Sequence, residues 1–133
     1  MADKSQAKRL LLVDDEVGYL EVLSKRLVHR GFDVTTASSG AEAIRALRNW
    51  EFDLAVVDLK MEDMDGIEVL KVLKRMDPAL HVIILTGHAT VESAIDGMKK
   101  GAYDYLMKPC DMDVLIDKLD GAAAKKREHE DKI

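Results

Sequence analysis

Short apolar runs alternate along the chain with longer segments in which apolar residues recur every three or four positions. The short runs predict strands near residues 9–13, 33–36, 53–57, 81–85 and 103–106. The first, third and fourth runs are almost continuously apolar. Strands covered on both faces by helices in a parallel sheet have this composition.

The longer segments predict helices over residues 17–30, from 39 onward, and over 66–76, 90–100 and from 111 onward. Gly31 is a stop signal for the first helix, and Ser39 and Asp111 are suitable N-caps. In the first helix, the expected apolar stripe consists of Val17, Leu20, Leu23 and Leu27.

The fourth predicted helix has a thin apolar face of Ala94, Ile95 and Met98, and Gly97 interrupts it. A glycine inside a helix costs ~1 kcal/mol relative to alanine. We therefore expect this helix to be the least stable of the five.

Strands alternating with helices predict an α/β fold with a doubly wound parallel sheet. We expect a polar N-terminal extension over residues 1–8, one domain over 9–121, and a helix end or tail over 122–133. Ligands of such sheets bind beyond the carboxyl ends of the strands.

Composition narrows the range of functions. The 133 residues are 47% hydrophobic, which suffices for a packed core, and the net charge of −5 argues against nucleic-acid binding by this segment. No apolar stretch is long enough for a membrane span. The single cysteine, Cys110, permits no internal disulfide and fits a reducing cytoplasm; we expect it to be an inert small residue.

Polar residues follow four of the predicted strands. Asp14 and Asp15 follow the first, Asp58 the third, Thr86 the fourth and Lys108 the fifth. In a parallel sheet these positions meet at one edge. Gathered carboxylates raise one another's pKa, and a Mg²⁺ ion removes that conflict. Asp58 stands alone at its strand end and is the better nucleophile for a phosphoryl group.

Each of these residues also has an ordinary structural explanation. Asp14 and Asp15 suit a helix N-terminus, Thr86 suits a turn, and Lys108 suits a solvated surface. Their joint placement at one edge of the sheet favours a binding site.

The chain resembles the receiver domain of two-component response regulators over about residues 9–120. The resemblance rests on Asp14-Asp15, Asp58, Asp65-Gly66, Thr86-Gly87-His88-Ala89 and Lys108-Pro109. The stretches 86–94 and 101–106 are most similar to receivers of the nitrogen-regulation class.

The resemblance implies a flavodoxin-like, five-stranded sheet of order 2-1-3-4-5 with five helices. It implies transfer of a phosphoryl group to Asp58 from a sensor histidine kinase. Mg²⁺ would be bound by Asp15, Asp58 and the backbone carbonyl of Lys60, with Asp14 acting through water. A cis Lys108–Pro109 bond is expected.

The resemblance also implies a conformational switch. Thr86 would move toward the phosphoryl group, and Tyr105 would rotate into the vacated space. The altered surface would comprise the fourth helix, fifth strand and fifth helix, where a downstream partner or a second copy would bind. On sequence alone, Tyr105 is equally well explained as a half-buried aromatic residue of an edge strand.

Three residues distinguish this chain from the family pattern or tune its chemistry. Glu62 stands where the pattern usually has proline, which adds negative charge near the metal. Lys60 and His88 lie two residues beyond Asp58 and Thr86. They are candidates for tuning the lifetime of the aspartyl phosphate.

The favoured function is therefore a phosphoacceptor without output chemistry of its own, forming the N-terminal part of a transcriptional regulator. A stand-alone single-domain regulator is the alternative. An aspartate-nucleophile phosphohydrolase fits less well, because such enzymes usually carry the nucleophile on the first strand. A flavin-binding module is disfavoured, because Asp14, Asp15 and Glu16 would repel the flavin phosphate.

Overall fold

A computed structural model describes residues 7–131, with side chains up to Lys125. Residues 1–6, most of the expected N-terminal extension, lie outside the described residues, as do residues 132–133. The strands are β1 (Arg9–Val13), β2 (Asp33–Ala37), β3 (Leu54–Val57), β4 (His81–Thr86) and β5 (Asp104–Met107). The helices are α1 (Val17–His29), α2 (Gly40–Asn49), α3 (Gly66–Met76), α4 (Val91–Lys99) and α5 (Met112–Asp131).

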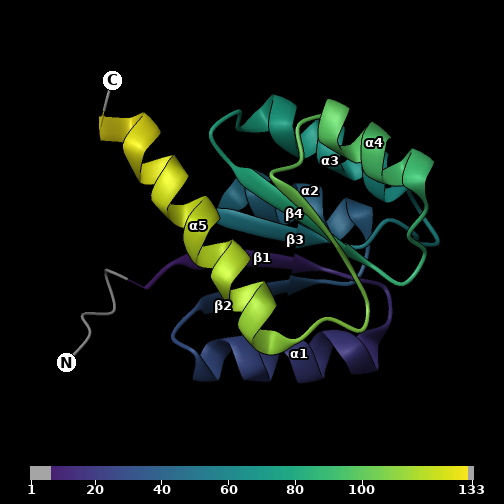
Figure 1. The fold of residues 1–133 in the computed structure, drawn as a ribbon, viewed down its shortest axis with the longest axis horizontal. Coiled ribbons are helices and arrows are strands. Elements are labelled where there is room, and N and C mark those ends of the chain that lie inside the picture. Colours follow the sequence, from purple (N-terminus) through teal and green to yellow (C-terminus); the bar gives the residue numbers. More distant parts are fainter. Residues whose placement is uncertain (1–6, 132–133) are drawn as a thin grey trace.

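The strands form one parallel sheet in the order β2-β1-β3-β4-β5 (Figure 1), which confirms the predicted flavodoxin-like topology. The register pairs Val13 of β1 with Val57 of β3. Asp14 and Asp58 each follow one member of this pair. The register therefore places these two acids side by side at the carboxyl edge of the sheet.

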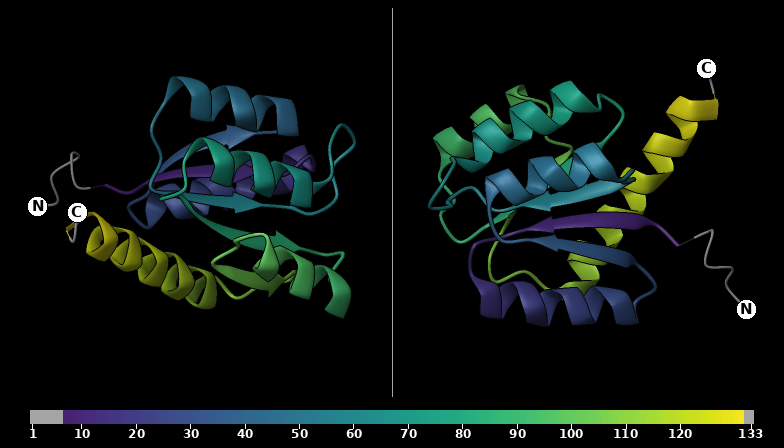
Figure 2. Two further views of the ribbon diagram at one scale, coloured as in Figure 1. Left: turned by 90° about the horizontal axis from the view of Figure 1, so that it is seen from above. Right: turned by 180° about the vertical axis from the view of Figure 1, so that it is seen from behind.

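Helices cover both faces of the sheet (Figure 2). Leucines of α1 and α5 pack on one face, around Leu10, Leu12 and Ile83. Residues of α2 and α3 pack on the other face, around Val57 and Ile84. β1 and β3 lie between two apolar layers, which explains why their sequences are continuously apolar.

The helix ends follow local rules that were visible in the sequence. The side chain of Ser39 accepts a hydrogen bond from the Glu42 amide at the start of α2. Asp111 accepts one from the Asp113 amide at the start of α5. Gly31 ends α1 in the left-handed region, with φ of 97°. The segment 122–133, expected as a helix end or tail, continues α5 as far as Asp131.

Two expectations about helix faces were wrong. Val17 was placed on the buried stripe of α1, but it is 63% exposed, and only Leu20, Leu23 and Leu27 of that stripe are buried. In α4, Ile95 and Met98 are about half exposed, whereas Gly97 is buried. A Cβ at Gly97 would lie 2.6 Å from Ile84 Cδ1, so the glycine lets α4 approach the sheet closely.

Within residues 7–131, no helix combines the length and the hydrophobicity that crossing a lipid bilayer requires.

Candidate functional site

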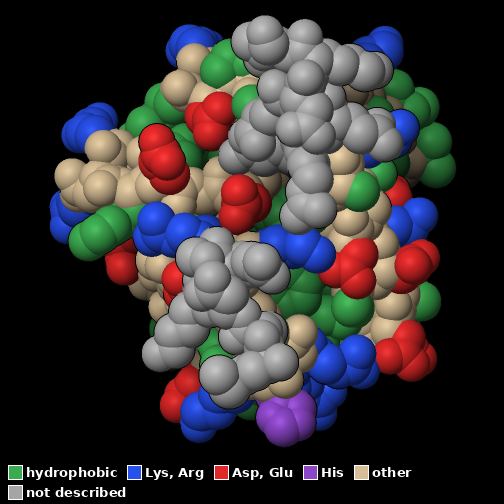
Figure 3. Space-filling model, turned by 90° about the vertical axis from the view of Figure 1, so that its left-hand side faces the viewer, with side chains coloured by type: hydrophobic (Ala, Val, Ile, Leu, Met, Phe, Trp, Pro, Cys, Tyr) green, Lys and Arg blue, Asp and Glu red, His purple; other side chains and the backbone are tan. Residues whose placement is uncertain are grey.

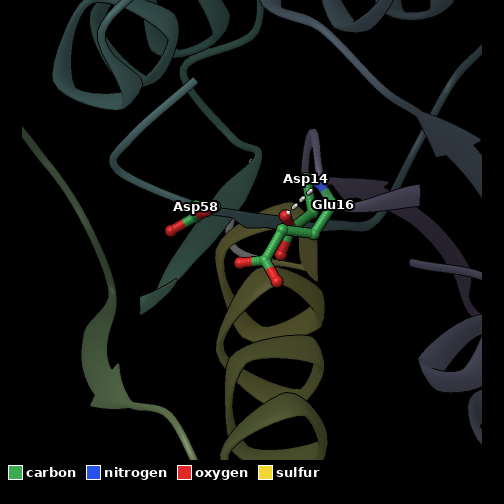
Figure 4. A group of neighbouring side chains, drawn as sticks. All are labelled: Asp14, Glu16 and Asp58. Carbon is green, nitrogen blue, oxygen red and sulfur yellow. Dashed lines mark hydrogen bonds between the residues drawn. The ribbon is translucent and has the colours of Figure 1, made fainter. Parts of the chain in front are cut away.

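Carboxylates from two strand ends meet at the carboxyl edge of the sheet. Oxygens of Asp14, Glu16 and Asp58 all lie within 4.8 Å of one another (Figure 4). Asp14 and Asp58 are buried, whereas the Glu16 side chain is 64% exposed. The Glu16 amide donates a hydrogen bond to Asp14 Oδ1 at 3.0 Å, which turns the chain so that Glu16 faces the other two acids.

Asp58 has an unusual arrangement for a buried acid. Its backbone N–H donates to the Val13 carbonyl at 3.0 Å, which continues the ladder between β1 and β3. Its Oδ1 atom is buried and has no hydrogen-bond partner among the described residues. An unsatisfied buried oxygen costs about 1–3 kcal/mol, so such an atom is expected at a site that accepts a ligand or a bond.

Lys108 reaches this group from the loop after β5. Its Nζ donates to Asp14 Oδ2 at 2.6 Å, and lies 3.7 Å from Glu16 Oε1 and 3.8 Å from Asp58 Oδ2. Its side chain is only 12% exposed. The Lys108–Pro109 bond is cis, as the resemblance implied.

Two groups of the site, Asp14 and Lys108, have raised pKa values. Burial raises the pKa of Asp14, and the hydrogen bonds from Lys108 and the Glu16 amide offset this only in part. Burial alone would lower the pKa of Lys108, but the hydrogen bond to Asp14 and the charges of Asp14, Asp58 and Glu16 raise it. The raised pKa of Asp14 thus reflects its burial, whereas the raised pKa of Lys108 reflects the carboxylates around it.

Asp15 lies outside this group of oxygens. Its Oδ2 accepts a hydrogen bond from the Glu62 amide at 3.1 Å, so it ties the loop after β3 to the loop after β1. Lys60 and Glu62 in that loop are exposed. Glu16, which sequence reasoning did not assign to the metal site, lies with Asp14 and Asp58 in the structure.

A hydrogen bond within the segment that follows β4 joins Thr86 and His88. Thr86 is fully buried, and its Oγ1 accepts a hydrogen bond from the His88 amide at 3.0 Å. The His88 side chain is exposed. The Thr86 O–H is a donor that this hydrogen bond does not use.

Tyr105 contacts α4 through a residue that sequence reasoning did not single out. Its hydroxyl lies 2.7 Å from Ser93 Oγ. Ser93 also completes the capping box of α4 with Thr90. The sequence shows a serine at the right spacing for a capping box, but the contact with Tyr105 depends on how α4 packs on β5.

The donor set suits a hard cation. Carboxylate oxygens are the ligands that Mg²⁺ prefers, and it needs only one or two of them in addition to waters and a phosphate oxygen. Asp14 and Asp58 provide these oxygens, and the unpartnered Oδ1 of Asp58 is one of them.

A hollow lies at the opposite end of the sheet, where the strands begin. It measures about 620 Å³, and Arg9, Trp50, Phe52 and Met76 contribute to its lining. Figure 3 views this end of the molecule, where hydrophobic, basic and acidic side chains are intermixed. In the lining of the hollow, the Arg9 guanidinium lies over the rings of Trp50 and Phe52. Among the described residues, the lining contains no group of carboxylates as close together as those of Asp14, Glu16 and Asp58.

The structure combines a doubly wound sheet with a group of carboxylates and a lysine at its carboxyl edge. Residues 10–120 match the model of the response regulator receiver domain, and the chain belongs to that family.

Named relatives refine this assignment. The chain is 41% identical over 113 residues to the transcriptional regulatory protein GlrR of Escherichia coli, which covers 85% of this chain and 26% of that protein. It is 41% identical over 119 residues to the transcriptional regulatory protein ZraR of Salmonella typhimurium, covering 90% and 27%. The chain therefore spans about a quarter of the length of these curated relatives.

Two solved structures also superpose closely on this chain. A CheY-like receiver domain protein from Methanospirillum hungatei superposes with a TM-score of 0.90 at 30% identity, covering 93% of this chain and 99% of that one. NtrX from Brucella abortus superposes with a TM-score of 0.89 at 28% identity, covering 95% and 29%. The expected similarity to receivers of the nitrogen-regulation class is confirmed.

Proposed function

We propose that Asp58 accepts a phosphoryl group from a phosphohistidine of a sensor histidine kinase. The observation that carries this proposal is the buried, unpartnered Oδ1 of Asp58 in a site that also contains two other carboxylates and Lys108. The carboxylate oxygen would attack phosphorus as the bond to the imidazole nitrogen breaks. The imidazole leaves the phosphoryl group on Asp58 as an acyl phosphate.

Mg²⁺ would be held by Asp58, Asp15 and the backbone carbonyl of Lys60, with Asp14 acting through water. Such an ion would neutralise charge on the phosphoryl oxygens and align them with Asp58. Glu16 is close enough to contribute a further oxygen. Asp15 Oδ2 accepts from the Glu62 amide, so the other carboxylate oxygen of Asp15 would be the one to bind the ion.

Lys108 and Thr86 would bind two phosphoryl oxygens, as a cation and as a neutral donor. Inverting a 1:99 population takes ~5.5 kcal/mol of differential binding. Hydrogen bonds to a charged group contribute about 1.5–3 kcal/mol each. Two such bonds together with the metal ion would supply most of the free energy that such a switch requires.

The switch would act through Tyr105. As Thr86 moves toward the phosphoryl group, Tyr105 turns inward and gives up its contact with Ser93. The surface affected is that of α4, β5 and α5. Its exposed apolar side chains suit a partner or a second copy of the domain; they include Val91, Ile95, Met98 and Met107.

In the complete protein we place this domain at the N-terminus of a cytoplasmic transcriptional regulator, because the named relatives are transcriptional regulatory proteins of about four times the matched length. The output domain and the kinase are then its partners, and nucleic acid would be bound elsewhere. A stand-alone regulator is the second candidate. A phosphohydrolase is the third, and it is disfavoured by the position of the lone acid on β3.

Incubation with acetyl phosphate and Mg²⁺, followed by intact-mass measurement, tests the proposal. Wild type should gain one phosphoryl group, and Asp58→Asn should gain none. Asp63→Asn is a matched control, because Asp63 lies in the same loop but accepts hydrogen bonds from the amides of Gly40 and Ala41 instead. Steady hydrolysis of unrelated phosphoesters would favour the phosphohydrolase.

We also propose that Lys60 and His88 tune the phosphoryl lifetime, because both are exposed and lie two residues beyond Asp58 and Thr86 in the chain. Decay of the phosphorylated form, followed by intact mass, should change in a Lys60→Ala, His88→Ala double mutant. An unchanged lifetime would exclude this role.

A further inference from the structure

We infer that Tyr19 is a positioning residue for Lys108, whose ammonium it holds beside Asp58 through the face of its ring. The inference rests on the proposed function of Asp58 as the phosphoacceptor. Tyr19 lies in the first turn of α1, and Lys108 Nζ is 4.1 Å from the centroid of its ring. An ammonium within about 6 Å of an aromatic centroid is attracted by the negative face of the ring.

The neighbours of Lys108 explain why such a contact is needed. Lysine carries its charge on a flexible four-carbon stem, and three carboxylates compete for it here. The nearest is Asp14, at 2.6 Å. Glu16, at 3.7 Å, is largely exposed and would draw the ammonium toward solvent. The phosphoacceptor Asp58, at 3.8 Å, is the farthest of the three.

The ring differs from these carboxylates in one physical respect. A carboxylate accepts hydrogen bonds in defined directions, whereas the attraction to a ring face depends weakly on the orientation of the ammonium. Lys108 can therefore leave Asp14 for a phosphoryl oxygen on Asp58 while it remains over Tyr19. The ring also helps to keep the Lys108 side chain at 12% exposure, which strengthens its interaction with charge.

The position of Tyr19 is itself well fixed. The residue is partly buried and packs against the apolar layer that α1 and α5 form on the sheet. Its anchoring by this layer means that the ring can constrain Lys108 rather than follow it. Tyr103 packs against the same layer, but its ring lies beside His81, with 5.2 Å between the ring centroids. Tyr103 therefore provides a matched control.

The test compares Tyr19→Leu, Tyr19→Phe and Tyr103→Leu for the rate of phosphorylation by acetyl phosphate with Mg²⁺. We expect Tyr19→Leu to react about five- to tenfold more slowly than wild type, in line with the strength of partly buried cation–π contacts. Tyr19→Phe keeps the ring face and should restore the rate to within about twofold. Tyr103→Leu should match wild type.

A spectroscopic measurement separates positioning from a merely structural role. The ring current of Tyr19 should move the NMR resonances of the Lys108 ε-protons upfield in wild type and in Tyr19→Phe. In Tyr19→Leu this displacement should be lost. If Tyr19→Leu fails to fold, fluorinated phenylalanines at position 19 keep the shape while weakening the ring face, and the rate should fall with each added fluorine.

The inference is overturned if Tyr19→Leu is phosphorylated at the wild-type rate, or if added fluorines at position 19 leave the phosphorylation rate unchanged. It is also overturned if the Lys108 resonances show no ring-current displacement in wild type. These outcomes leave the proposed function intact, because wild type still accepts a phosphoryl group at Asp58. Absence of phosphorylation in wild type would overturn the proposed function itself, and the inference with it.

Discussion

Thr86 is fully buried, and its hydroxyl can accept one hydrogen bond and donate another. Its Oγ1 accepts from the His88 amide at 3.0 Å, and its O–H would donate to a phosphoryl oxygen on Asp58. In the proposed switch, this side chain links the chemistry at Asp58 to the rotation of Tyr105.

We predict that Thr86→Ala is phosphorylated to the wild-type extent but switches poorly. Loss of one hydrogen bond to a charged group, worth about 1.5–3 kcal/mol, should lower the ratio of switched to unswitched molecules about 10- to 100-fold. NMR of the Tyr105 ring before and after phosphorylation measures this ratio. Thr86→Ser keeps the hydroxyl and should switch; an equally complete switch in Thr86→Ala would contradict the mechanism.

Gly66 is a second residue whose role is set by its neighbours. Its N–H donates to the Leu59 carbonyl at 2.7 Å, and a Cβ at this position would lie 2.2 Å from the Asp58 carbonyl oxygen. The backbone at Asp58 and Leu59 thus passes directly against the start of α3.

Gly66→Ala should destabilise the protein by about 2–4 kcal/mol, because backbone atoms cannot yield as a side chain can. Gly18→Ala is the control, since a Cβ at Gly18 in α1 meets nothing within 4 Å and should stabilise by up to about 1 kcal/mol. Urea denaturation measures both changes. Equal effects of the two substitutions would show that helix propensity, and not the close approach, controls position 66.

Helix α4 shows how packing changes the meaning of a sequence pattern. From sequence, Gly97 indicated a weak helix with Ala94, Ile95 and Met98 as its buried face. In the structure, Gly97 faces the sheet, and Ile95 and Met98 lie on the exposed side. The helix is anchored at its start by the capping box of Thr90 and Ser93 and by the contact of Ser93 with Tyr105.

A double-mutant cycle at Gly97 and Ile84 can separate the two effects of the glycine. Gly97→Ala alone should be destabilising, because the new Cβ would lie 2.6 Å from Ile84 Cδ1. In an Ile84→Val background that methyl group is absent, and the same change should approach the ~1 kcal/mol gain expected from helix propensity. Thermal or urea unfolding gives the coupling energy. Strict additivity would mean that the close contact does not limit the approach of α4.

Folding of the whole domain brings an excess of carboxylates to one edge of the sheet. Asp14 and Asp58 come from paired strands, and Lys108 is the cation held among them. A cation that binds only when this edge is assembled must stabilise the folded state.

We expect Mg²⁺ to raise the free energy of unfolding by about 2.7 kcal/mol at one hundred times its dissociation constant. Asp58→Asn should abolish most of this gain. Asp15→Asn should reduce it more than Glu16→Gln if Asp15 is a ligand, as the family resemblance implies. The reverse order would make Glu16 the ligand, in agreement with its place among the carboxylate oxygens that lie within 4.8 Å of one another. Thermal unfolding at constant ionic strength, with Na⁺ as the comparison, measures these differences.

The sequence by itself determined the order of strands and helices, the parallel α/β class, and the four strand ends that carry polar groups. These features depend on residue periodicity and on local signals such as the cap at Ser39, which act within a few positions of the chain. The alignment of Asp14 with Asp58 also followed, since parallel strands end at one edge of the sheet.

Only the tertiary structure decided which side chains meet. Asp14, Asp15 and Glu16 are consecutive at one strand end, yet their side chains differ in their partners. Asp15 accepts a hydrogen bond from the Glu62 amide, whereas Glu16 lies with Asp14 and Asp58. Tyr19 meets Lys108 because α1 and the loop after β5 converge on the same side of the sheet. Such contacts depend on register, helix rotation and rotamer choice, which join residues far apart in the chain and leave no local pattern in its sequence.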